Sequence, residues 1–138
     1  MGPHFIAVHE MIDPQVEEVR GMADASAERI ATLGGSPKGT PGAIVAERTW
    51  DEYSLGRATT QEHLGALDVV YAGVIESHRE AIEKVGDVDP VTEDMLIAQS
   101  TQLEKFQWFV RAHLEGSGGT LSTGSATTEK LAARSARR

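Results

Sequence analysis

Apolar residues recur every three or four positions in three long stretches of the sequence, the spacing of one face of an α-helix. The first stretch covers residues 3–33 and ends at Gly34-Gly35, a common helix stop. The second covers residues 59–86 and the third covers residues 89–115. Helices of this length pack on one another through such apolar faces, so the pattern predicts an all-α fold.

The second and third stretches begin with helix-capping residues. Thr59 and Glu62 have the spacing of a capping box, and Asp89 followed by Pro90 suits an N-cap and first helical position. The connection between these two helices is short, so we expect antiparallel neighbours. Residues 34–58, between the first and second stretches, form a long connection for a bundle, which indicates a crossover.

The composition excludes several kinds of functional site. The chain has no cysteine, so disulfides, thiolate metal sites and thiol nucleophiles are excluded, and a metal ion would need His, Asp and Glu ligands. The sequence has no apolar run of about 18 residues and no recognisable secretory signal at its start. We therefore expect a cytoplasmic protein without a membrane partner.

Charge divides the chain into an acidic body and a basic end. Four of the 13 Lys and Arg residues, and one of the 21 Asp and Glu residues, lie after residue 115. Residues 1–115 thus carry a net charge of −11, and residues 116–138 carry +3. The end is rich in Gly, Ser, Thr and Ala, so we expect a helical domain over 1–115 and a flexible tail over 116–138. The tail's basic residues either bind DNA phosphates non-specifically or only keep the chain end soluble: Lys130, Arg134, Arg137 and Arg138.

The first helical stretch carries one histidine and three carboxylates at helical spacing. His9 and Asp13 are four residues apart, as are Asp24 and Glu28. At about 100° per residue, the four share one wedge of the helix surface, and their nitrogen and oxygen atoms could bind a metal ion. The two pairs are centred about 22 Å apart along a helix, so one ion cannot contact both pairs of one chain. Two copies packed antiparallel about a two-fold axis would bring the pairs together at two inter-subunit sites.

Two interpretations of these four side chains remain open. Pairs at this spacing are common on exposed helix faces, so they are either metal ligands or solvated surface. Pro14 favours the second interpretation for Asp13, because a proline inside a helix costs about 3 kcal/mol. The helix would then end near Ile12, and Asp13 would cap a new helix with Pro14 at its first position.

The segments GPHFIAVHEMID, MADASAERIATLGG and KFQWFVRAHL resemble the Dps family, DNA-binding proteins from starved cells with a ferritin-like fold. The resemblance covers residues 2–115 and includes the spacing H-x3-D-x10-D-x3-E. It implies a four-helix bundle with a long crossover, assembled through two-fold dimers into a dodecameric shell. The family pattern has another long helix and a further histidine ligand before Gly2. We therefore expect a bundle that lacks its first helix and a site that lacks one ligand.

The resemblance also implies a chemistry. His9 and Asp13 of one subunit and Asp24 and Glu28 of its neighbour would form a ferroxidase site for one or two iron ions, with Glu28 bridging. Fe²⁺ would be oxidised preferably by hydrogen peroxide, and ferric mineral would be stored in the shell, which protects DNA under stress. The basic tail resembles that of mycobacterial members and implies nucleoid association and DNA condensation.

Three hypotheses of function follow. The first is a ferroxidase and iron store that also binds DNA. The second is a nucleoid-associated protein that compacts DNA without ferroxidase activity. The third is a helical oligomerisation module whose acidic helix face is only solvated.

Overall fold

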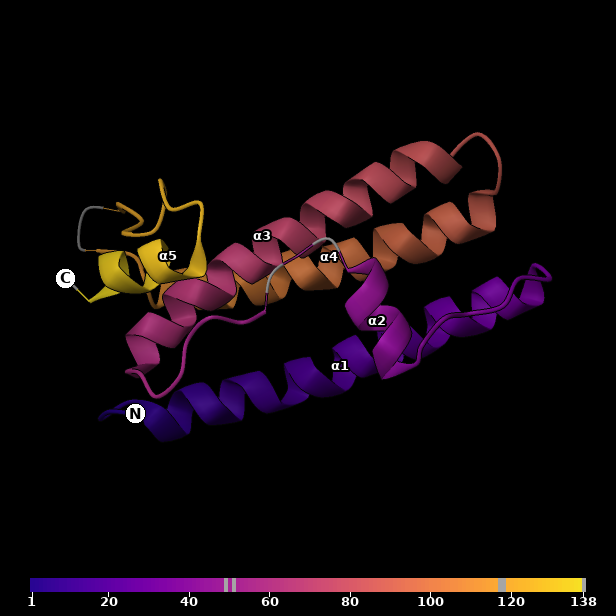
Figure 1. Ribbon diagram of the computed structural model, residues 1–138. Helices are drawn as coiled ribbons and strands as arrows, with labels where there is room; N and C mark the ends of the chain where they lie inside the picture. Colours follow the sequence, from indigo (N-terminus) through magenta and orange to yellow (C-terminus); the bar gives the residue numbers. More distant parts are fainter. Residues whose placement is uncertain (49, 51, 117–118, 138) are drawn as a thin grey trace. The chain divides into compact units, whose positions relative to one another are not determined.

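The computed structural model describes residues 1–48, 50, 52–116 and 119–137 (Figure 1). These residues divide into two compact units, Met1–Ile6 with Ser54–Arg138 and Ala7–Tyr53. The regular elements of the described part of the chain are all helices, with one isolated β-bridge besides, and this confirms the all-α prediction. In chain order the helices are α1 (Phe5–Thr32), α2 (Pro41–Glu47), α3 (Thr60–Val85), α4 (Pro90–Ala112) and α5 (Glu129–Ala136).

Helix α1 ends at the two glycines, as the sequence predicts. Gly34 has a φ of +84°, in the left-handed region where a side chain would be strained. Its N–H donates to Ala31 O at 3.0 Å, and the N–H of Gly35 donates to Ile30 O at 2.8 Å. These two bonds form a Schellman motif, which satisfies carbonyls that the helix end leaves without partners.

Helix α2 lies within the long connection and is not predicted by the hydrophobic pattern. Thr40 caps it by accepting a hydrogen bond from Ala43 N at 3.3 Å, and Pro41 is its first residue. Seven residues are too few to show a helical period, but Thr followed by Pro is a start signal that the sequence does contain.

Helices α3 and α4 pack side by side as the predicted antiparallel pair (Figure 1). Thr59 and Glu62 form the complete capping box of α3, and Asp89 caps α4 through Val91 N at 3.3 Å. The rings of Tyr71 and Phe106 lie 6.5 Å apart between the two helices. The core of this unit is apolar and consists mainly of Leu64, Ala66, Tyr71, Ile75, Leu103, Phe106, Val110 and Leu114.

The C-terminal segment differs from the flexible tail that its composition predicts. Residues Glu129–Ala136 form α5, which packs against α3 in the same compact unit. Ala132 and Ala133 are buried in this contact. A Cβ atom added at Gly65 would lie 2.7 Å from Ala132 O, so the absence of a side chain at Gly65 permits the close approach. Small residues on both helices thus provide a contact that composition alone does not show.

Candidate functional site

Helix α1 runs without interruption through Pro14, from Phe5 to Thr32. The proposed break near Ile12 is therefore wrong, and Asp13 is not the N-cap of a second helix. His9 Nδ1 lies 3.4 Å from Asp13 Oδ1, and both side chains are more than half exposed. A nitrogen and an oxygen donor thus stand one helical turn apart on an exposed face.

Asp24 and Glu28 form the second pair on the same helix. Both are exposed and stand one turn apart. Because the helix is continuous, the separation of about 22 Å between the two pairs applies along its axis. Among the described residues, no group of three or more His, Asp or Glu side chains lies close enough to hold a metal ion. The chain by itself brings the four residues together only as two separate pairs.

Two polar clusters lie in the other unit, and the sequence predicts only the Thr59–Glu62 capping box within them. The first centres on Asp68 of α3, whose side chain is 6% exposed. Its Oδ1 accepts hydrogen bonds from Gln107 Nε2 at 2.9 Å and Arg111 Nε at 2.7 Å, and its Oδ2 accepts one from Thr123 Oγ1 at 2.9 Å. A carboxylate within the apolar run LGALDVVYAGVI is the signal that indicates such a buried cluster.

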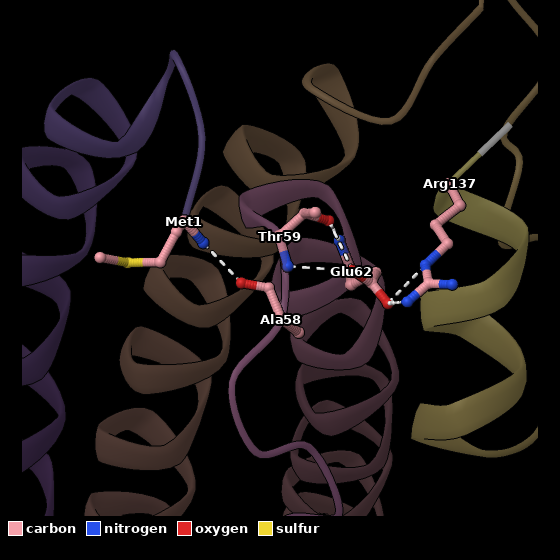
Figure 2. A network of polar contacts seen from close by, with 5 residues as sticks. All are labelled: Met1, Ala58, Thr59, Glu62 and Arg137. Atoms are coloured by element: carbon pink, nitrogen blue, oxygen red, sulfur yellow. Dashed lines mark hydrogen bonds and ion pairs between the residues drawn. The ribbon is translucent and has the colours of Figure 1, made fainter.

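The second cluster joins both ends of the chain to the start of α3 (Figure 2). Glu62 Oε2 accepts hydrogen bonds from Thr59 N at 2.9 Å and Thr59 Oγ1 at 2.8 Å. Glu62 Oε1 accepts from Arg137 Nε at 2.7 Å, with Arg137 Nη2 2.6 Å away. The N-terminal ammonium of Met1 donates to Ala58 O beside them.

These contacts hold the Glu62 carboxylate in its charged form. The backbone N–H of Thr59, the Arg137 guanidinium and the Thr59 hydroxyl lower the pKa of Glu62 to about 2, against the smaller opposing effect of burial. Glu62 is therefore ionised at neutral pH and pairs with Arg137.

The four basic residues predicted to bind DNA fall into three classes. Lys130 and Arg134 lie on α5 and are exposed. Arg137 is engaged by Glu62, although its side chain is still 66% exposed. Arg138 lies outside the described residues.

The described helices include none with the length and apolar character needed to span a membrane.

A family model described as a ferritin-like domain matches residues 1–117. The DNA protection during starvation protein of Mycolicibacterium smegmatis is 66% identical over 138 residues, which make up 100% of this chain and 75% of that protein.

Solved structures of Dps proteins are also similar to this chain. The structure of Mycobacterium smegmatis Dps superimposes with a TM-score of 0.89 at 66% identity, over 93% of this chain and 74% of that one. DpsA14 from Streptomyces coelicolor gives a TM-score of 0.88 at 68% identity, over 89% of this chain and 73% of that one. The chain belongs to the Dps family of ferritin-like proteins.

Proposed function

We propose that this protein oxidises iron at sites shared between two copies of the chain and stores the ferric product inside an assembled shell. The proposal rests on the uninterrupted course of α1 through Pro14, which keeps His9, Asp13, Asp24 and Glu28 on one helix. Two pairs separated by about 22 Å cannot serve one ion within a chain, but an antiparallel neighbour supplies the complementary pair.

The donor set suits Fe²⁺ as the substrate. His9 contributes nitrogen and the three carboxylates contribute oxygen, a combination typical of iron sites with open positions. In each site His9 and Asp13 would come from one subunit and Asp24 and Glu28 from its partner, with Glu28 placed to bridge two ions. Hydrogen peroxide would accept one electron from each of two Fe²⁺ ions, and the ferric product would be deposited inside the assembled shell.

Binding of DNA by the C-terminal segment is the second part of the proposed function. Lys130 and Arg134 present two exposed positive charges on α5. Two contacts to phosphate are weak and sensitive to salt, but a dodecameric shell carries many copies of α5 and gains affinity through multivalency. We place such a shell in the cytoplasm on the nucleoid, where iron oxidation with peroxide would protect the bound DNA. Compaction of DNA without ferroxidase activity is the alternative.

Complementation between two inactive chains tests the shared site. One chain carries His9→Ala with Asp13→Ala, and the other carries Asp24→Ala with Glu28→Ala. Each chain alone is expected to lose Fe²⁺ oxidation. In a co-expressed random mixture, half of the dimers are mixed and hold one intact site of two, so about a quarter of the wild-type sites return.

The readout is the initial rate at which ferric absorbance grows after Fe²⁺ and hydrogen peroxide are added. Absence of recovery in verified mixed dimers refutes the shared site. Full activity in either parent chain removes the corresponding pair from the site, whereas a wild-type chain that does not oxidise Fe²⁺ leaves the DNA-compacting alternative.

A further inference from the structure

The carboxylate of Glu62 serves two structures at the same time. Its Oε2 accepts the backbone N–H of Thr59 and thereby completes the capping box of α3. Its Oε1 accepts from the Nε of Arg137, the C-cap residue of α5. Figure 2 shows the two roles on opposite sides of the carboxylate. One side chain thus links the start of α3 to the end of the C-terminal helix.

Arg137 is held there by the docking of the whole of α5. The close approach of Ala132 and Ala136 to Gly65 holds the second half of the helix on α3. At the other end, Glu129 accepts hydrogen bonds from the backbone N–H and the hydroxyl of Ser54. The ion pair with Glu62 is therefore an attachment at the C-cap of α5, beyond these two contacts, and its loss should loosen the end of the helix at Arg137 first.

We propose that Glu62 masks Arg137 from phosphate ligands, so that the docked C-terminal segment offers Lys130 and Arg134 to DNA and gains Arg137 only when the last turn of α5 leaves Glu62. This inference rests on the proposed binding of DNA by that segment. It makes the contact between α3 and α5 an autoinhibitory one that sets how many cations each chain presents.

The competition has a simple chemical basis. A guanidinium group binds a carboxylate and a phosphate through the same N–H donors, so Arg137 cannot give its Nε and Nη2 edge to both. Glu62 occupies that edge with a single oxygen. The low pKa of Glu62, near 2, keeps the competitor charged over the whole neutral range. A DNA phosphate must therefore displace a preformed partner.

The variant Glu62→Gln separates the two roles of the carboxylate. Glutamine is compatible with a capping box, but its amide has one acceptor oxygen and no charge. It can serve Thr59 or Arg137 and not both. Glu76→Gln removes the same charge from an exposed position on α3 and is the matched control. Arg137→Ala removes the masked cation and leaves Glu62 with Thr59.

The experiment measures the binding of the full-length chain and these variants to a short fluorescein-labelled DNA duplex of mixed sequence, by anisotropy at several salt concentrations. Each additional phosphate contact steepens the dependence of log K on log salt by about one unit. We expect this increase for Glu62→Gln, no increase for Glu76→Gln, and no effect of Glu62→Gln when Arg137→Ala is also present. Hydrogen exchange should show faster exchange in the last turn of α5 in Glu62→Gln.

Several results overturn the masking. The first is an equal change in the salt dependence for Glu62→Gln and Glu76→Gln. The second is a change for Glu62→Gln that persists when Arg137→Ala is also present. The third is unchanged hydrogen exchange of α5 in Glu62→Gln. Faster exchange without a steeper salt dependence leaves DNA binding by Lys130 and Arg134 in place but refutes the masking. If the wild-type chain and every variant fail to bind the duplex, the proposed DNA binding fails as well.

Discussion

The hydroxyl of Thr123 donates to Asp68 Oδ2 at 2.9 Å, across 55 residues of sequence, and ties the segment before α5 to the middle of α3. Both side chains are buried at this contact. The same carboxylate accepts from Arg111 and Gln107 of α4 through its other oxygen. Three separate parts of the chain therefore depend on one buried charge.

Asp68→Asn should lower the free energy of unfolding by about 1.5–3 kcal/mol, the range for hydrogen bonds to a charged group. The amide has one acceptor oxygen, and its NH₂ group would face either the donors at Oδ1 or the hydroxyl of Thr123. Thr123→Val removes only one donor and should cost about 1 kcal/mol. Urea unfolding followed by circular dichroism measures the free energy of unfolding of both variants. Equal decreases in Asp68→Asn and Thr123→Val would contradict a leading role for Arg111.

Gly65→Ala should detach α5 from α3. The new Cβ atom would meet Ala132 O at 2.7 Å, closer than side chains approach backbone oxygens. A Cβ atom added at Gly73, on the same helix, would meet open space, so Gly73→Ala should raise stability by about 0.5–1 kcal/mol through helix propensity alone. Hydrogen exchange of α5 amides should accelerate in the first variant and stay unchanged in the second. Retained protection in Gly65→Ala would show that α5 can shift without leaving α3.

The low pKa of Glu62 predicts a loss of stability in acid. The carboxyl titrates near its ordinary value of 4.5 in the unfolded chain and at about 2 in the folded protein. The folded state therefore gains stability that is fully present above about pH 4.5 and is lost as the pH falls toward about 2. The Tm of the wild-type protein should exceed that of Glu62→Gln at neutral pH, and the difference should close in this window.

Glu18→Gln is the control for the acid titration, because Glu18 is an exposed carboxylate on α1. The difference in Tm between Glu18→Gln and the wild type should stay constant as the pH falls from about 4.5 to about 2. A difference between wild type and Glu62→Gln that persists undiminished below about pH 2 would mean that Glu62 acts through its shape and not its charge.

Lys130→Ala and Arg134→Ala should each weaken DNA binding and reduce the salt dependence of log K by about one unit. Both residues are exposed on α5, so each can reach a phosphate while the helix stays docked. Arg137→Ala should have a smaller effect, since Glu62 already engages that side chain. Anisotropy of a labelled duplex measures all three variants. Equal reductions in the three would show that α5 binds DNA only when it is undocked.

Local signals in the sequence predict the parts of this fold that depend on neighbours in the chain. The capping box of Thr59 and Glu62 and the stop at Gly34 are formed by residues within a few positions of one another. The contact of Arg137 with Glu62 joins residues 75 positions apart, and no local pattern encodes it. It exists only because α5 docks on α3, which depends on small residues that composition associates with flexible segments.

For the candidate metal pairs too, local spacing predicts the contacts between neighbours in the chain and not those between distant residues. The spacing of His9 and Asp13 predicts their adjacency, and the structure confirms it. The apolar spacing over residues 3–33 predicts one helix, but Pro14 leaves a break near Ile12 open, since proline removes the N–H that would bond the Glu10 carbonyl. Glu10 and Pro14 are both exposed, so water can satisfy that carbonyl and reduce the cost of the proline. The complementary pair in a second chain follows from distance alone and stays a prediction.

Asp24→Asn combined with Glu28→Gln should reduce the initial rate of Fe²⁺ oxidation by more than about tenfold, because even substitutions that only orient a metal ligand cost at least this much. The replacements keep the shape of both side chains and remove their charge, so α1 should stay helical by circular dichroism. Glu18→Gln, on the same helix but outside the face that carries the two pairs, should leave the rate unchanged. If both variants lower the rate equally, the effect of carboxylates on α1 is a general attraction of cations, and the paired arrangement has no special role in oxidation.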